Sequence, residues 1–407
     1  MRLGRDFDRF WAAATVSNLG DGIRLSALPL LALTLTDDAR LIGLVSASSL
    51  LPWAVLGPIG GALVDRGDRR TLMISGQVFR AVLVLGLALL VAADQATVLA
   101  VIVVALGIGS AEVIVDTSSQ SAVPLLVGRE QLERANARLI TSLIVFDEMI
   151  GLALGAVLFA AVAELPFLVD SATFLLGGVL LATVRRPLQG ERTRTTTVRT
   201  DIVDGIRFLV HHRFLRSMMV TITTSNLAGN MAFGVLVILV VDELDTDPAM
   251  YGVVLAVGAV LGLVGALTAP RLTELVGRRR LLGSLQPPLI LSYLINAVAT
   301  SAWMVSVAFG LASFAIACFN VPAQSIRQSV IPEPLLGRVV ATWRMFGMSA
   351  GPVGAVLGGV IAESAGIRWS YLAAAVLGFV AWLMVLWSLR YLDEALAATN
   401  QSEKSSP

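Results

Sequence analysis

Residues 57–72 read Gly-Pro-Ile-Gly-Gly-Ala-Leu-Val-Asp-Arg-Gly-Asp-Arg-Arg-Thr-Leu, and this stretch decides how the rest of the chain is interpreted. A glycine-rich apolar run ends in a short loop with acids and three arginines, and a new apolar run follows at once. A weaker copy lies 209 residues later, where Leu272 and Glu274 correspond to Leu63 and Asp65. The recurrence of a charged loop between apolar runs predicts a chain built from two related halves.

The composition places the chain in a membrane. It has 407 residues, of which 56% are hydrophobic and 14% charged, and its mean hydropathy is +0.80. Soluble domains are about one quarter charged, so we predict an integral membrane protein. The net charge of +1 predicts no nucleic-acid partner. Cys318 is the single cysteine, and His211 and His212 have no Cys cluster or HExxH motif near them, so we expect no disulfide, metal or cofactor.

Twelve segments are long and apolar enough to cross the hydrocarbon core, which needs about 20 residues. The first apolar run is too long for a cleavable signal peptide. The predicted spans are 10–35, 41–64, 72–93, 97–124, 138–163, 166–184, 215–241, 249–270, 281–299, 303–326, 340–362 and 369–390.

The basic residues predict the orientation. All but four of the 30 Lys and Arg residues lie at the termini or in the even-numbered connections. Arg40 and Arg368 stand alone on the opposite side, where the connection 242–247 is wholly acidic or uncharged. By the positive-inside rule both termini are cytoplasmic. We expect a multi-pass protein of a bacterial cytoplasmic membrane, and a monomer.

These spans predict four regions. Residues 1–184 form an N-terminal six-helix bundle, and 214–392 form a C-terminal one. Between them, 185–213 is a cytoplasmic linker, in which 201–210 has the spacing of an amphipathic helix on the inner membrane surface. The polar tail 393–407 is expected to be disordered.

The two halves also match within the spans. Ser17-Asn18-Leu19 recurs as Ser225-Asn226-Leu227 at an offset of 208, and residues 155–158 recur at 354–357 at an offset of 199. Six spans followed by six in the same orientation make a parallel repeat. Such repeats are related by an axis along the membrane normal, and the substrate site lies between them near the midplane.

The spans and loops resemble the major facilitator superfamily over essentially the whole chain. The superfamily's loop pattern, Gly-x-Leu-x-Asp-Arg-x-Gly-Arg-Arg/Lys, is matched except that Asp68 stands where the pattern has glycine. The run 17–22 and the run from Glu112 to Asn136 resemble the drug-efflux branch that includes macrolide exporters and an enterobactin exporter. The matching positions are Gly61, Leu63, Asp65, Arg66, Arg69 and Arg70.

This resemblance implies that the loop acts as a latch between the halves on the cytoplasmic side, with Asp65 stabilising the outward-open state. The alternative is that the arginines only set topology and bind lipid phosphates. The second copy contributes Glu274, Arg278 and Arg279.

Two departures concern the coupling mechanism. Many proton-coupled exporters of the superfamily carry an arginine in span four, and residues 101–111 have none. Many antiporters carry Gly-Pro-x-x-Gly in span five, whereas here that form occurs in span eleven, at 351–354.

Ionisable residues inside spans are expensive to insert and are therefore functional candidates. The N-terminal half contains Asp21, Arg24, Arg80, Glu112, Asp116, Asp147 and Glu148. Spans seven to ten offer neutral groups instead: Asn226, Asn230, Asn320 and Gln324. We hypothesise that the N-terminal half handles protons and the C-terminal half shapes the substrate cavity.

Spacing suggests how these residues are arranged. Asp21 and Arg24 share a helix face, either as a structural pair or as a protonatable, substrate-contacting acid. Glu112 lies one turn from Asp116. Two close carboxyls in low dielectric rarely ionise together, so one is expected to hold a proton; alternatively, Asp116 is solvated at the inner boundary. Of the adjacent Asp147 and Glu148, one faces the cavity and the other is paired, with Arg80 or Arg138 as candidates.

The function predicted from these features is secondary transport by alternating access, as proton-coupled efflux of amphipathic drugs or other small molecules. No Gly-Lys-Ser/Thr follows Gly60 and Gly61, so ATP is not the direct driver. The alternatives are a dedicated metabolite or siderophore exporter, and an importer or lipid flippase of the same fold. A polytopic enzyme is disfavoured because no catalytic constellation lies within the spans.

Overall fold

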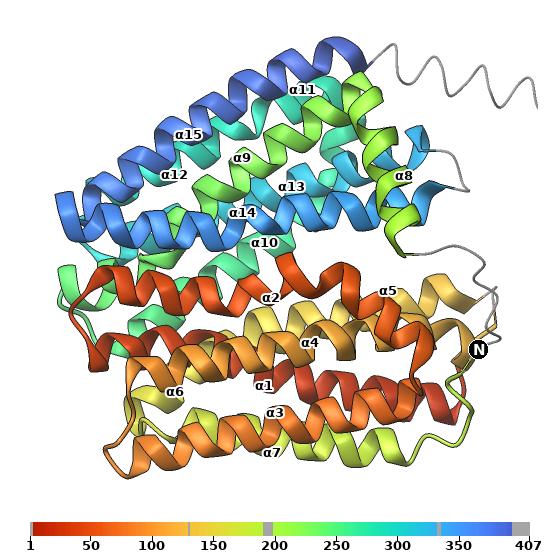
Figure 1. The fold of residues 1–407 in the computed structure, drawn as a ribbon. Coiled ribbons are helices and arrows are strands. Elements are labelled where there is room, and N and C mark those ends of the chain that lie inside the picture. Colours follow the sequence, from red (N-terminus) through yellow and green to blue (C-terminus); the bar gives the residue numbers. More distant parts are fainter. Residues whose placement is uncertain (1–2, 129–130, 190–197, 332–334, 393–407) are drawn as a thin grey trace, which may run out of the picture. The chain divides into compact units, whose positions relative to one another are not determined.

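We analysed a computed structural model of the chain, which describes residues 3–128, 131–189, 198–331 and 335–392 (Figure 1). The described residues are almost entirely helical, without a strand. They form two compact units: Met1–Thr195 with Val237–Ala256, and Thr196–Leu236 with Val257–Pro407. We call them unit 1 and unit 2. The predicted all-helical membrane fold is confirmed, and the predicted domain limits remain a prediction.

Unit 1 holds the first six predicted spans. Its span five is interrupted by a π-helical segment, η2, which contains both acids of that span. In Figure 1, α1 and α3 both pack against α7, while α4 packs against α2 and α3. The helices are α1 (Arg5–Leu35), α2 (Ala39–Arg66), α3 (Arg69–Ala92), α4 (Val98–Leu126), α5 (Leu132–Ser142), η2 (Leu143–Gly151), α6 (Leu152–Ala161) and α7 (Leu165–Ala182).

The second half of the chain contains the linker helix and the last six predicted spans. Within unit 2, α9 packs against α14 and α15, and α12 packs against α13 and α15. The elements are α8 (Val198–His211), α9 (Arg213–Gly234), η3 (Ile238–Glu243), α10 (Pro248–Val276), α11 (Arg278–Ser284), α12 (Gln286–Ala297), α13 (Ala302–Val330), α14 (Leu336–Ala365), α15 (Ile367–Ser388) and η5 (Leu389–Tyr391).

Each predicted span coincides with a helix or a run of consecutive helices. In the described part of the chain, nine helices can cross a membrane by length and composition alone. The predicted spans 10–35, 215–241 and 281–299 are not among them. The first carries the charged residues Asp21 and Arg24, the second is rich in Ser, Thr and Asn, and the third is broken at Leu285 into two short helices.

Glycines let helices meet backbone to backbone. A β-carbon at Gly151 or Gly155 would overlap the Leu19 or Ile23 carbonyl of α1. In unit 2, Gly354 and Gly358 meet Leu227 and Met231 of α9 in the same way. Leu227 and Met231 stand 208 residues after Leu19 and Ile23, so Gly151 corresponds to Gly354 and Gly155 to Gly358. The match of residues 155–158 with 354–357 was therefore wrong by one helical turn.

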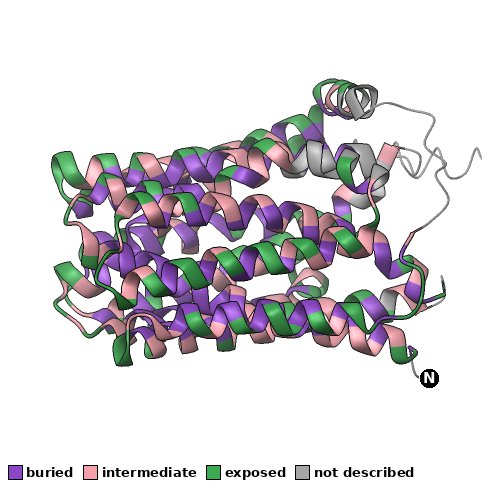
Figure 2. Ribbon diagram, turned by 60° about the horizontal axis from the view of Figure 1, so that its bottom comes forward, coloured by how far each residue is buried: buried purple, intermediate pink, exposed green. Residues whose placement is uncertain are grey.

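The outer faces of the helices are apolar. Figure 2 shows buried and exposed positions alternating along the helices. Large hydrophobic side chains such as Leu267, Trp303 and Val376 are among the exposed ones. An apolar outer face is typical of helices that contact lipid. The backbone polar groups of such helices are hydrogen-bonded within the helix, because lipid offers them no partners.

The limits and the cytoplasmic place of the linker remain a prediction. A helix, α8, covers the stretch predicted to be amphipathic; its place on the membrane surface remains a prediction. The tail 393–407 lies outside the described residues.

Candidate functional site

The buried charges of unit 1 begin with a pair on α1. Arg24 Nη2 lies 2.8 Å from Asp21 Oδ1, so the predicted pairing of these residues is confirmed. The Arg24 side chain is 6% exposed and that of Asp21 is 16% exposed. Neither charge can be solvated fully by water, so each depends on partners from other helices.

Arg80 of α3 is the second guanidinium. Its Nη1 lies 3.4 Å from Asp21 Oδ2, and its Nη2 donates to Gln77 Oε1 at 2.7 Å and to Ser17 Oγ at 3.3 Å. The guanidinium also lies over the Phe174 ring, 4.3 Å from its centroid. The sequence suggested Arg80 as a partner for one of the span-five acids. In the structure Arg80 instead forms an ion pair with Asp21.

Asp170 of α7 completes the buried part of the cluster and was not predicted. Its carboxyl is fully buried, with Oδ2 3.4 Å from Arg24 Nε. It lies against Gly20, where a β-carbon would overlap Asp170 Oδ1 and Thr173 Oγ1. A sequence signal existed, because Asp170 is the only charged residue inside predicted span six.

Glu112 of α4 is the more accessible acid. Its Oε2 lies 3.7 Å from Arg24 Nη2, and its side chain is 29% exposed. Asp116, one turn further along, is half-buried and close enough for the two charges to interact. The predicted shared face of this pair is therefore present.

The cluster carries more carboxyls than guanidiniums. Asp21, Glu112 and Asp170 face Arg24 and Arg80 at ion-pair distance. If all five groups were ionised, one negative charge would remain unbalanced in a low-dielectric interior. One bound proton would remove that imbalance.

The acids of span five lie beside this cluster. The Asp147 backbone packs against Gly22 of α1, and its charge interacts with those of Asp21 and Glu112. Its Oδ1 is buried and has no hydrogen-bond partner within the described ranges of the chain. Glu148 is exposed. The suggested partner Arg138 binds Asp8 instead, at 2.6 Å.

Unit 2 contains a cavity of about 310 Å³. Three of the four predicted polar residues, Asn226, Asn230 and Asn320, line it. The fourth, Gln324, is exposed and is not part of the lining. The cavity is partly open and is lined mainly by residues of α9, α12 and α13. Its volume is at the lower end of the range for small-molecule sites.

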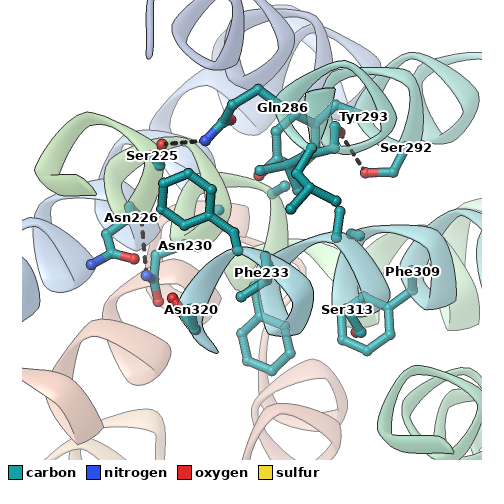
Figure 3. A pocket seen from close by; sticks show the side chains of 18 of the residues that line it. Ser225, Asn226, Asn230, Phe233, Gln286, Ser292, Tyr293, Phe309, Ser313 and Asn320 are labelled. Carbon is teal, nitrogen blue, oxygen red and sulfur yellow. Dashed lines mark hydrogen bonds between the residues drawn. The ribbon is translucent and has the colours of Figure 1, made fainter. Parts of the chain in front are cut away.

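Further polar groups of the cavity come from α12 and were not predicted. Gln286 Nε2 donates to Ser225 Oγ at 3.5 Å, and Figure 3 shows this bond on one side of the cavity. Gln286 Oε1, Tyr293 OH and Asn296 Oδ1 are buried without a hydrogen-bond partner among the residues that the structure describes. The fold repeat could have indicated Gln286, which stands 209 residues after Gln77.

The repeated loop binds within unit 1. Arg69 Nη1 donates to the carbonyls of Ser121 at 3.1 Å and Leu188 at 3.4 Å. Arg70 Nη2 donates to the Val184 carbonyl and, at 3.0 Å, to that of Arg186. These arginines thus hold the C-terminal end of α4 and the chain that follows α7, where cations are favourable.

Asp68, the departure from the loop pattern, is the N-cap of α3. Its Oδ1 accepts hydrogen bonds from the Thr71 backbone N–H and hydroxyl, both at 2.8 Å. These bonds hold the pKa of Asp68 below its usual value. In the second copy Gly277 stands at this position with a φ of 84°, a conformation that favours glycine.

The latch residues remain a prediction. The backbone of Gly61, Asp65 and Arg66 belongs to α2, but their side chains lie outside the described part of the structure. Glu274, Arg278 and Arg279 are exposed around the turn between α10 and α11.

The sequence matches the family described as transmembrane secretion effectors over residues 4–406. The protein belongs to this major facilitator family. The multidrug efflux pump Tap of Mycolicibacterium fortuitum is 26% identical, with 94% of this chain and 96% of Tap aligned. The MFS-type transporter YfiS of Bacillus subtilis is 25% identical, with 97% of this chain and 95% of YfiS aligned. Macrolide efflux protein A of Streptococcus pyogenes is 31% identical, but only 46% of this chain and 47% of that protein are aligned.

Solved structures agree on the fold. A bacterial homologue of the iron transporter ferroportin matches with a TM-score of 0.76 and 16% identity, covering 96% of this chain and all of that one. The nucleoside transporter NupG matches with a TM-score of 0.69 and 15% identity, covering 95% of this chain and all of its own. By the family match and the efflux relatives, the protein is a multi-pass membrane transporter and not an enzyme.

Proposed function

We propose that the protein exports small molecules from the cytoplasm by alternating access, in exchange for protons. The relatives named as multidrug and macrolide efflux proteins support export. The observation that carries proton coupling is the buried cluster of unit 1, in which three carboxyls share two guanidiniums.

The cluster can exist in two charge states. With one carboxyl protonated it is neutral and can be sealed from water at low cost. Without the proton it carries a net negative charge, which is expensive in a low-dielectric interior unless water reaches it. Glu112, the most exposed of the three acids, is the natural entry point for the proton.

The energetics are sufficient for efflux. Moving one charge through 100 mV supplies about 2.3 kcal/mol. At about 1.4 kcal/mol per tenfold change, one proton supports a concentration gradient of roughly fiftyfold. In this proposal both termini are cytoplasmic and the protein acts in a bacterial cytoplasmic membrane.

Transport in proteoliposomes tests the proposal. A panel of lipophilic cations, uncharged antibiotics and dyes is offered with and without an imposed pH gradient. We expect gradient-driven accumulation by the wild type, and its loss in Glu112→Gln. Asp94→Asn is the matched control, because Asp94 is an exposed loop residue with a φ of 53°, which asparagine tolerates. Accumulation that persists after collapse of the gradient would refute proton coupling.

A further inference from the structure

Each unit contains an equivalent serine–glutamine hydrogen bond, and the two bonds align the sequences of the two repeats. Gln77 Nε2 donates to Ser17 Oγ at 3.2 Å in unit 1, and Gln286 Nε2 donates to Ser225 Oγ at 3.5 Å in unit 2. The serines are 208 residues apart and the glutamines 209. The same contact therefore joins α1 to α3 and α9 to α12.

This alignment places the cavity of unit 2 where unit 1 holds its charges. Four charged positions have small, apolar or amide counterparts, and all four counterparts line the cavity. Loss of the long charged side chains leaves space that is not refilled. The counterparts of Asp21, Arg24, Arg80 and Glu112 are Gly229, Ala232, Leu289 and Asn320.

The described wall of the cavity is mostly apolar and carries polar groups but no charged one. None of its lining residues is Asp, Glu, Lys, Arg or His. Gln286, Tyr293 and Asn296 are each 4% exposed, and each has a buried polar atom that no described part of the chain hydrogen-bonds. Buried polar groups are normally hydrogen-bonded, so these atoms favour a ligand that brings the missing partners. Two of them are amide oxygens, which accept hydrogen bonds.

The apolar part of the wall includes two neighbouring aromatic rings. Phe233 of α9 and Phe309 of α13 both line the cavity, and their rings are stacked with centroids 6.2 Å apart. Figure 3 shows both rings on the opposite side from Gln286. A flat ring system can pack against these faces while its polar edge reaches α12.

We propose that this cavity binds the substrate, and that the substrate is an uncharged small molecule with hydrogen-bond donors on an aromatic or alicyclic frame. This rests on the proposed function, because it identifies the chemical class that the exporter carries. A cation or anion entering the cavity would lose its hydration without meeting an opposite charge. The charges in unit 1 and the neutral ligand in unit 2 divide proton and substrate between the two repeats.

Equilibrium binding of three matched fluorescent probes to the full-length protein in lipid nanodiscs tests this. Dansylamide is neutral, dansylglycine is an anion, and dansyl-ethylenediamine is a cation on the same ring system. We expect dansylamide to bind most tightly. Tyr293→Phe and Asn296→Leu should each weaken it roughly three- to tenfold, the effect of one hydrogen bond. The matched control is Tyr251→Phe, since Tyr251 is equally buried but lies outside the cavity.

A variant that introduces a negative charge sharpens the test. Asn320→Asp changes a cavity amide into a nearly isosteric carboxylate at the position that corresponds to Glu112. It should shift the preference from dansylamide to the cationic probe. The same order of affinities as in the wild type would show that the probes bind elsewhere and would overturn the assignment.

Failure of this inference is distinguishable from failure of the proposed function. Two results would overturn the neutral-substrate site. One is the absence of saturable dansylamide binding, as expected for a cavity that holds water only, and the other is tighter binding of a charged probe by the wild type. Proton-driven transport could persist in either case. Intact dansylamide binding without proton-driven transport of any compound would instead refute the proposed function and leave the site standing.

Discussion

Replacing Arg24 should destabilise unit 1 far more than replacing any acid of the cluster. Arg24 lies within 2.8 Å of Asp21, 3.4 Å of Asp170 and 3.7 Å of Glu112. In Arg24→Gln three carboxyls would share the single guanidinium of Arg80. Removing one partner from a buried ion pair costs about 3–5 kcal/mol. At roughly 2–4 °C per kcal/mol for a unit of this size, the apparent melting temperature should fall by about 10 °C.

Glu112→Gln should behave differently, although it also removes one charge. It leaves two carboxyls with two guanidiniums, and the lost contact is long and partly exposed, so the cost is about 1 kcal/mol or less. The assay is the temperature at which the purified, detergent-solubilised protein loses its monodisperse peak in size-exclusion chromatography.

A double variant tests the charge-balance reasoning itself. Arg24→Gln with Asp170→Asn restores the wild-type excess of one carboxyl over the guanidiniums. It should therefore be more stable than Arg24→Gln alone, with a coupling energy of about 0.5–3 kcal/mol. Equal losses for Arg24→Gln and Glu112→Gln, or no rescue by Asp170→Asn, would refute the reasoning.

Three further predictions follow from particular contacts. Gly20→Ala would place a β-carbon against Asp170, so it should lower stability by about 1–3 kcal/mol; Gly86→Ala, with open space at that position, should not, and equal melting temperatures would contradict this. Burial lowers the pKa of His212, whose Nδ1 accepts from the Leu215 N–H at 3.3 Å. The cap is thus present above the unfolded pKa of about 6.5 and lost as pH falls through the lower folded value. Amide exchange in the first turn of α9, corrected for intrinsic rates, should therefore be faster at about pH 5 than at neutral pH, and His212→Asn should remove that difference. Exchange of a neutral substrate for one proton moves a charge, so a potassium diffusion potential should drive transport at equal pH, and failure to do so would indicate electroneutral exchange.

The fold was largely predictable because hydropathy acts locally along the chain. Every predicted span coincides with helical structure, and the Asp21–Arg24 pair follows from spacing along one helix. The register of span five was wrong because the short Gly-Ala-Val-Leu match is weak evidence, whereas contacts of Gly151 and Gly155 with α1 fix the alignment.

The candidate sites were predicted less completely because they depend on contacts between helices. Arg80 meets Asp21 across 59 positions of sequence, a distance that periodicity does not reach. Asp170 was detectable as an acid within a span but had no neighbour in sequence to suggest a partner. Gln286 and Asn296 are amides within predicted span nine and were as visible in the sequence as Asn226 and Asn320. The sequence does not show that they and Tyr293 line the same cavity as the residues of spans seven and ten. The internal repeat could have indicated Gln286, because it relates the pair Ser17 and Gln77 to the pair Ser225 and Gln286.

Proton release on substrate binding tests the central claim most directly. The purified protein is mixed with a transported compound in weakly buffered solution containing a pH indicator. The account predicts that the wild type and Asp94→Asn release protons, and that Asp21→Asn, Glu112→Gln and Asp170→Asn all lose this release, because each balances the cluster without a proton. Binding by the wild type with no proton release, or loss of release in only one of the three variants, would contradict a proton shared by the whole cluster.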